Sequence, residues 1–450
     1  MADQLWSKDA PLDRLVHEFT VGEDPQTDLA LMEWDCIGSA AHARMLASIN
    51  LIPREAASTL VAELKTLRDE AARGELIIRP EQEDGHTAIE ALLTKRVGEP
   101  GRMIHLGRSR NDQIALATRL WMRSRVLTIA EAVADLVDAF LAFAAANIDI
   151  TIPGYTHLRR AMPSSAGQWA AAFAEGLMEE LDALAGLWAR LDRCPLGSAA
   201  GFGVPIPLDR DETAALLGFT HVQISPIDVQ NSRGRHEAAM MHWLASIAGV
   251  LEKFCWDCLL YSTEEFGFLR IPEAFTTGSS IMPQKRNPDV LELARGRCRE
   301  IRGYAALMDH LGTGSPSSYH RDFQLVKRPA MESAHQTERL VRVLTYVIPG
   351  LVLDRARAAA ACTDELWATQ AAFDLTKEGI PFRDAYRQVA AEVTSGEFQR
   401  PTSEPEGSLG APDNLRLDRI LQRFDNQRMW LDDQSDAWEQ VELRLWEPLH

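Results

Sequence analysis

The feature that most constrains the fold is a long run without glycine or proline, from Arg108 to Ile152. Apolar residues within it recur at helical spacing, as at Val133, Leu136, Val137, Phe140 and Leu141. This spacing predicts one helix of roughly 50 Å or more. Since a helix this long normally buries its apolar face against other long helices, the run predicts a helical bundle.

Three further segments share this character and are rich in alanine and leucine: residues 164–193, about 235–266, and 288 to about 311. Glycines inside them, such as Gly176, fit the close approach of neighbouring helices. Strand signals are confined to Leu76–Ile78 and His221–Ile224, which could be sheet edges or plain loops. The sequence therefore predicts an all-α fold with very little sheet.

Breaks in the helical pattern divide the chain. They fall at residues 98–101, at Pro349 and Gly350, and in the polar stretch 395–414, which is predicted to be a surface loop. We expect an N-terminal helical domain over 1–107, a central long-helix bundle over 108–355 and a small C-terminal helical domain over 356–450. Apolar faces left over on such a bundle favour an oligomer whose protomers share sites.

Charge and composition exclude several functions. The formal net charge of −18 argues against binding to nucleic acid or to an anionic membrane surface. Residues 1–15 lack the apolar stretch of a secretory signal, and no apolar run is long enough to span a bilayer, so we expect a cytoplasmic protein. Cys255 and Cys258 could form a redox or zinc site, but without a second ligand pair nearby we favour buried thiols.

Residues 276–289 are the segment most suggestive of chemistry. Small residues and Gly278 predict an exposed loop, and Pro288 suits the start of the helix that follows. A loop that leads into a helix is an arrangement that binds anions. The polar side chains close enough to converge on one carboxylate are Ser279, Ser280, Lys285 and Asn287, and Glu292 follows on the helix. A solvated serine-rich turn is the alternative reading of the residues alone.

This loop resembles the Gly-Ser-Ser-x-Met-Pro-x-Lys-x-Asn-Pro signature of the fumarase/aspartase superfamily, with every fixed position matched. Residues 107–113 (Gly-Arg-Ser-Arg-Asn-Asp-Gln) and 154–158 (Gly-Tyr-Thr-His-Leu) resemble its argininosuccinate lyase branch. Residues 317–327 are similar to the Tyr-x-x-Asp-x-Gln-x-x-Lys region of that branch. The resemblance spans roughly residues 19–390 and implies a three-domain fold whose central bundle forms a tetrameric core.

The same resemblance implies a reaction. It is the anti elimination of argininosuccinate to fumarate and arginine, the last step of arginine biosynthesis, with no cofactor and no metal. Ser279 would be the base, with Ser280 as the alternative, and Lys285 with Asn287 would stabilise the intermediate. His157 would protonate the departing nitrogen, oriented by Glu292. Base and acid could also be exchanged between serine and histidine, and the sequence leaves this open.

Further residues are implied to hold the substrate. Ser109, Arg110, Asn111 and Thr156 would bind its carboxylates. Tyr319, Gln324 and Lys327 match the residues that hold the amino and carboxyl groups of the arginine half. Helix capping and surface polarity are the alternative explanations for Ser109 and Tyr319.

Two departures from the family pattern stand out. The family's N-terminal serine has no clear equivalent, with Thr20 as the candidate replacement, and the usual Ser-x-Arg-Asp is altered at residues 231–235. These changes affect substrate contacts and leave the elimination residues in place. The competing hypotheses are another fumarate-releasing lyase, similar to adenylosuccinate lyase or fumarase, and a catalytically silent structural homologue similar to a lens crystallin.

Overall fold

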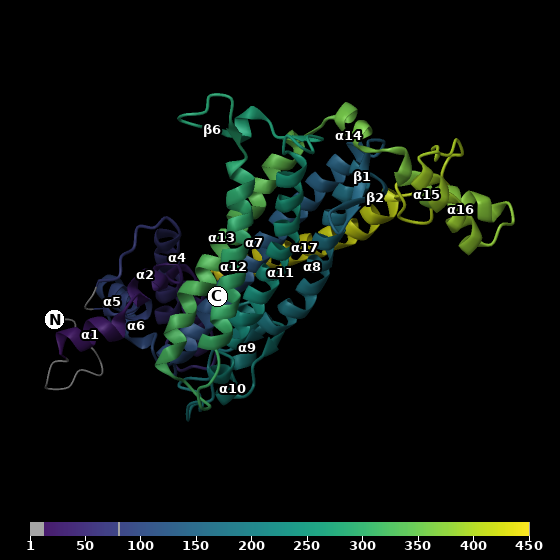
Figure 1. Ribbon diagram of the computed structural model, residues 1–450. Helices are drawn as coiled ribbons and strands as arrows, with labels where there is room; N and C mark the ends of the chain where they lie inside the picture. Colours follow the sequence, from purple (N-terminus) through teal and green to yellow (C-terminus); the bar gives the residue numbers. More distant parts are fainter. Residues whose placement is uncertain (1–12, 80–81, 450) are drawn as a thin grey trace.

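The computed structural model describes residues 13–79 and 82–449 and is built almost wholly from helices (Figure 1). Residues 1–12 lie outside the described residues. They include most of the segment over residues 1–15 that lacks the apolar stretch of a secretory signal. The first helices lie together at one side of the chain (Figure 1). They are α1 (Arg14–Val21), α2 (Asp24–Leu29), α3 (Met32–Ser48), α4 (Arg54–Ala72), α5 (Gly85–Val97) and α6 (Glu99–Met103).

The predicted long-helix bundle is confirmed. The ring of Phe140 packs edge-on against that of Phe254, 4.9 Å between centroids, within the buried core that joins the helices. One bundle helix, α13, was not predicted, although Pro329 in its first turn is compatible with helix. The bundle comprises α7 (Arg110–Ala146), α8 (Ala166–Leu191), α11 (Arg235–Tyr261), α12 (Asp289–Leu311) and α13 (Lys327–Val347), which pack against one another.

The largest departure from the predicted pattern is a hairpin between α7 and α8. Strands β1 (Thr151–Thr156) and β2 (Arg159–Ser165) pair antiparallel, with Pro153 opposite Pro163. These residues lack the apolar alternation that signals a strand, and proline is tolerated because both strands are edges. The turn places His157 and Leu158 at φ 53° and 57°, the left-handed region that a two-residue hairpin turn requires.

The remaining strands are two residues long, so the prediction of very little sheet is confirmed. Residues 75–79, which include Leu76–Ile78, are irregular, whereas His221–Val222 forms β4 and pairs parallel with β3 (Arg193–Cys194). Cys255 and Cys258 are buried free thiols whose pKa values burial raises, as predicted. The short elements are α9 (Arg210–Leu216), α10 (Pro226–Asn231), β5 (Leu269–Arg270), β6 (Thr277–Gly278), β7 (Arg286–Asn287) and β8 (Val352–Leu353).

The C-terminal part returns to the bundle. The predicted surface loop is confirmed as irregular backbone over residues 396–416. Helix α17 (Leu417–Leu445) then packs along α7 and α8, where Gln427 Nε2 donates to the carbonyl of Met178 at 2.8 Å. No helix among the described residues is long and apolar enough to cross a membrane. The helices before α17 are α14 (Arg355–Ala361), α15 (Ala368–Lys377) and α16 (Phe382–Ser395).

Candidate functional site

The first candidate residues sit at the start of α7. Ser109 is its N-cap: its Oγ accepts from the backbone N–H of Asn111 at 3.3 Å, and its own N–H donates to Asp112 at 2.9 Å. This capping box satisfies N–H groups that would otherwise lack partners. Ser109 therefore has a structural role, and it positions Arg110 and Asn111 in the first helical turn.

Arg110 faces the loop before α5. Its Nη1 lies 3.2 Å from Asp84 Oδ2, and its Nη2 donates to Thr87 Oγ1 at 2.8 Å. Beside it is a small pocket of about 120 Å³, in which four predicted binding residues meet although they come from distant parts of the sequence. The pocket is lined by Asp24, Asp28, Glu83, Asp84, His86, Arg110, Asn111, Ile114, Tyr319, Arg321 and Gln324.

Lys327 lies next to this pocket but does not line it. Its side chain is only 1 % exposed, and its Nζ is 2.8 Å from Asp24 Oδ1 and 2.5 Å from Asp28 Oδ1. Burial raises the pKa of Asp24 above its ordinary value, although the positive charge of Lys327 opposes that rise. The positive charge of Lys327 is thus balanced by Asp24 and Asp28 inside the protein. Lys327 would therefore act on a ligand by fixing the positions of these two aspartates.

The sequence reasoning missed Asp24 and Asp28. Their spacing of four places both on one face of a helix, and this was the available signal. Thr20, considered as the missing N-terminal contact, does not line the pocket, and its Oγ donates to the carbonyl of Val16 at 2.9 Å. The part of the pocket that comes from the N-terminal region is therefore formed by Asp24 and Asp28 of α2, and not by Thr20.

Replacing Lys327 with methionine should destabilise the fold strongly. The substitution leaves Asp24 and Asp28 buried side by side without their cation, and we expect the free energy of unfolding to fall by about 3–5 kcal/mol. Arg328→Met is the matched control, because Arg328 and its partner Glu23 are exposed. Urea unfolding followed by circular dichroism measures both. Equal midpoints for the two variants would contradict the structural role of Lys327.

The loop over residues 276–289 is confirmed as an exposed hairpin. Strands β6 and β7 pair antiparallel at its base, and Thr277 Oγ1 donates to Asp289 at the start of α12. Ser279 Oγ accepts from the backbone N–H groups of Ile281 at 3.3 Å and Met282 at 3.1 Å. Lys285 is exposed on the same hairpin. The loop therefore presents a hydroxyl that already receives two N–H groups, with a lysine near it in sequence.

The remaining predicted site residues lie outside both this loop and the Arg110 pocket. The predicted proton donor His157 and the predicted substrate contact Thr156 are exposed at the tip of the β1–β2 hairpin. Glu292 is exposed on α12, with its carboxylate 4.0 Å from Arg295. Figure 1 shows the β6 loop, the β1–β2 hairpin and the α2–α5 region at three separate places. One chain thus brings together Arg110, Asn111, Tyr319 and Gln324. The predicted substrate contacts Thr156 and Asn287 do not line that pocket, and Ser279 does not lie with His157.

The altered segment at residues 231–235 contacts the irregular segment that carries Tyr319. Asn231 Oδ1 accepts from the backbone N–H of Ser318 at 2.7 Å, and the guanidinium of Arg233 lies 6.0 Å from the Tyr319 ring centre. Gly234 has φ 81°, and a Cβ there would come within 2.7 Å of the Cα of Gly312. Glycine is required at this position by both conformation and space.

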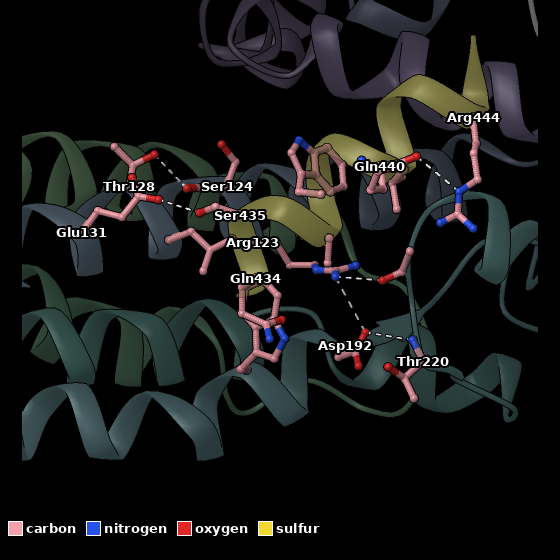
Figure 2. A pocket seen from close by; sticks show the side chains of 16 residues that line it. Arg123, Ser124, Thr128, Glu131, Asp192, Thr220, Gln434, Ser435, Gln440 and Arg444 are labelled. Carbon is pink, nitrogen blue, oxygen red and sulfur yellow. Dashed lines mark hydrogen bonds and ion pairs between the residues drawn. The ribbon is translucent and has the colours of Figure 1, made fainter. Parts of the chain in front are cut away.

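A larger pocket of about 600 Å³ lies between α7, α8 and α17 (Figure 2). None of the predicted site residues lines it. Arg123 lies over the rings of Trp188 and Phe219, at 4.9 and 4.5 Å, and donates to the carbonyl of Gly218 at 2.9 Å. Glu131 accepts from Ser435 at 2.7 Å on the other side of the pocket. These contacts join α17 and the 218–220 turn to the bundle, which is a structural role.

Comparisons with known proteins agree with this geometry. The chain matches the model of a family described as lyase over residues 4–303. It is 44 % identical to argininosuccinate lyase of Sorangium cellulosum, over 94 % of this chain and 99 % of the relative. It is 40 % identical to argininosuccinate lyase of Stenotrophomonas maltophilia, with the same two coverages.

Solved structures show the same fold. EDDS lyase in complex with formate aligns with a TM-score of 0.78 at 24 % identity, over 97 % of this chain and 95 % of that chain. Class II fumarase from Schistosoma mansoni aligns with a TM-score of 0.73 at 14 % identity, over 86 % and 91 %. The family model and the sequence relatives show that the chain belongs to the lyase family of the fumarase/aspartase superfamily, in its argininosuccinate lyase branch.

Proposed function

We propose that this chain cleaves argininosuccinate to fumarate and arginine by anti elimination. The observation that carries the proposal is the structure of the loop over residues 276–289, where the Ser279 hydroxyl receives two backbone N–H groups. A serine hydroxyl is a weak acid, so it can act as a base only if the charge of its alkoxide is stabilised. The two N–H groups and Lys285 supply that stabilisation once the loop closes over substrate.

Ser279 would remove the proton from the carbon next to one carboxylate of the succinyl half. Negative charge then develops on that carboxylate, and Lys285 with Asn287 would stabilise it more strongly in the transition state than in the ground state. Asn287 Nδ2 is 3.4 Å from the carbonyl of Gly278, so its amide already lies across the base of the loop. Closure of the exposed loop would also exclude water.

His157 would then protonate the departing guanidino nitrogen, with Glu292 orienting its ring. The exchange of roles between Ser279 and His157 remains an alternative within this proposal. Because the two residues lie apart in one chain, we propose a homotetramer in which different protomers contribute the Ser279 loop, the His157 hairpin and the Arg110 pocket to one site.

A fumarate assay tests the proposed substrate. We expect the purified protein to release fumarate, followed by its ultraviolet absorbance, from argininosuccinate and to release none from adenylosuccinate or malate. Release from another of these substrates alone would show a different lyase of the same fold. The absence of turnover with all three at high protein concentration would favour the silent, crystallin-like alternative.

A further inference from the structure

His86 is a buried histidine that the proposed elimination does not use. It is 8 % exposed, lies in the first turn of α5, and lines the same pocket as Arg110, Asn111, Tyr319 and Gln324. Its Nδ1 is 2.6 Å from Asp35 Oδ2, and the Asp35 side chain is also buried. This carboxylate fixes the orientation of the ring.

The other ring nitrogen, Nε2, has no hydrogen-bond partner within residues 13–79 and 82–449. The side-chain carbonyl oxygen of Gln324, which lines the same pocket, also lacks a partner within these ranges. A buried polar group without a partner costs about 1–3 kcal/mol, so a ligand that supplies the missing partner gains that free energy on binding. Two such groups in one small pocket point to a polar ligand.

The charged surroundings decide which form of the ring is present. Burial on its own would lower the pKa of His86, but the charge of Asp35 and the hydrogen bond to it outweigh burial and raise that pKa above its ordinary value. The same contact lowers the pKa of Asp35 against the effect of its own burial. The titratable and charged groups around the ring are Asp24, Asp28, Asp35, Glu83, Asp84, His105, Arg108, Arg110, Arg321 and Lys327.

We infer that His86, held by Asp35, is a further substrate-binding residue, and that its Nε2–H donates to a carboxylate oxygen of the substrate beside Arg110 and Asn111. This inference rests on the proposed function and adds a residue to its binding pocket. A donor of this kind complements Arg110, whose guanidinium is partly committed to Asp84 and Thr87. Asp35 would act as a positioning residue, because its carboxylate contacts His86 and Ser39 and does not line the pocket.

Two substitutions at His86 separate binding from folding. Asparagine can place its amide nitrogen near the Nδ1 position and keep the contact with Asp35, whereas glutamine can reach the Nε2 position. We expect His86→Asn to raise the KM for argininosuccinate about 10- to 100-fold with a smaller change in kcat, and His86→Gln to recover part of the loss. His105→Asn is the matched control, since His105 is partly exposed and does not line the pocket.

The pH profile gives a readout that a purely structural role would not move. The protonated ring binds the carboxylate, so the KM should stay low below the pKa of His86 and rise as the pH passes through it. Asp35→Asn removes the charge that raises this pKa, and the rise in KM should therefore begin at a lower pH. If Asp35→Asn does not fold, the two His86 variants measured at pH 6 and pH 8 replace it: neither amide titrates, so both should lose the rise in KM that wild type shows between these pH values.

The outcomes are distinct. A folded His86→Asn variant with a KM within twofold of wild type would overturn the inference, as would an unmoved pH profile in folded Asp35→Asn.

Product inhibition shows which half of the substrate His86 binds. Weaker inhibition of His86→Asn by fumarate or by arginine identifies that half, and unchanged inhibition by both products would also overturn the inference. If wild type releases no fumarate, the proposed function fails, and calorimetric binding of succinate to wild type and His86→Asn then tests the histidine by itself.

Discussion

Substitution of Lys285 by methionine is expected to lower kcat about 10³-fold, the upper end of the range for loss of one preorganised charge-stabilising group. Lys285 is the one cation of the 276–289 loop for which the family resemblance implies contact with the intermediate. Methionine keeps the length and apolar stem of the side chain and removes only the charge. Initial rates of fumarate release at saturating argininosuccinate measure the effect.

The same loop provides the control. Arg286 is adjacent, equally charged and exposed, but its guanidinium pairs with Glu273 at 3.1 Å at the base of the hairpin. Arg286→Met should therefore reduce kcat less than about tenfold, in line with the small contributions of exposed ion pairs. Similar losses in both variants would mean that the net charge of the loop matters and would remove the specific role given to Lys285.

The sequence predicted the bundle because helical periodicity over long segments is a local signal. Helices α7, α8, α11 and α12 begin and end close to the predicted limits. The β1–β2 hairpin was missed because its register depends on cross-strand pairing and on a turn formed by His157 and Leu158, residues that seldom adopt positive φ. Helix α13 (Lys327–Val347) was missed; only its first residue, Lys327, was interpreted, as the end of the binding motif over residues 317–327.

The site was predictable to the extent that its residues occur in contiguous motifs. Arg110, Asn111, Tyr319 and Gln324 do meet in one pocket. Asp24, Asp28 and His86 were not assigned, because their roles depend on partners that fold next to them from α3 and α13. The spacing of Asp24 and Asp28 places them on one face of a helix, but their pairing with Lys327 leaves no mark in a single sequence and is evident only once the helices are placed.

Mixing two inactive variants should restore activity, and this is the largest change that the shared-site proposal predicts. His157→Asn and Ser279→Ala should each be nearly inactive alone, because each removes a group that transfers a proton. After the two are unfolded together and refolded as mixed oligomers, some sites would combine an intact hairpin from one protomer with an intact loop from another. Fumarate release should then rise far above that of either variant.

The matched control is a mixture of Ser279→Ala with Lys285→Met. Both defects lie on one loop, so in the shared-site arrangement every site would receive a loop that carries one of them, and mixing should restore nothing. Recovery in the first mixture and none in the second would require that the loop and the His157 hairpin of a site come from different chains. The absence of recovery in both mixtures would instead mean that each chain builds its own site, by a movement of the 276–289 loop toward β1–β2 that the separation in Figure 1 makes large. Recovery in the second mixture would contradict the placement of Ser279 and Lys285 in one site by the same loop.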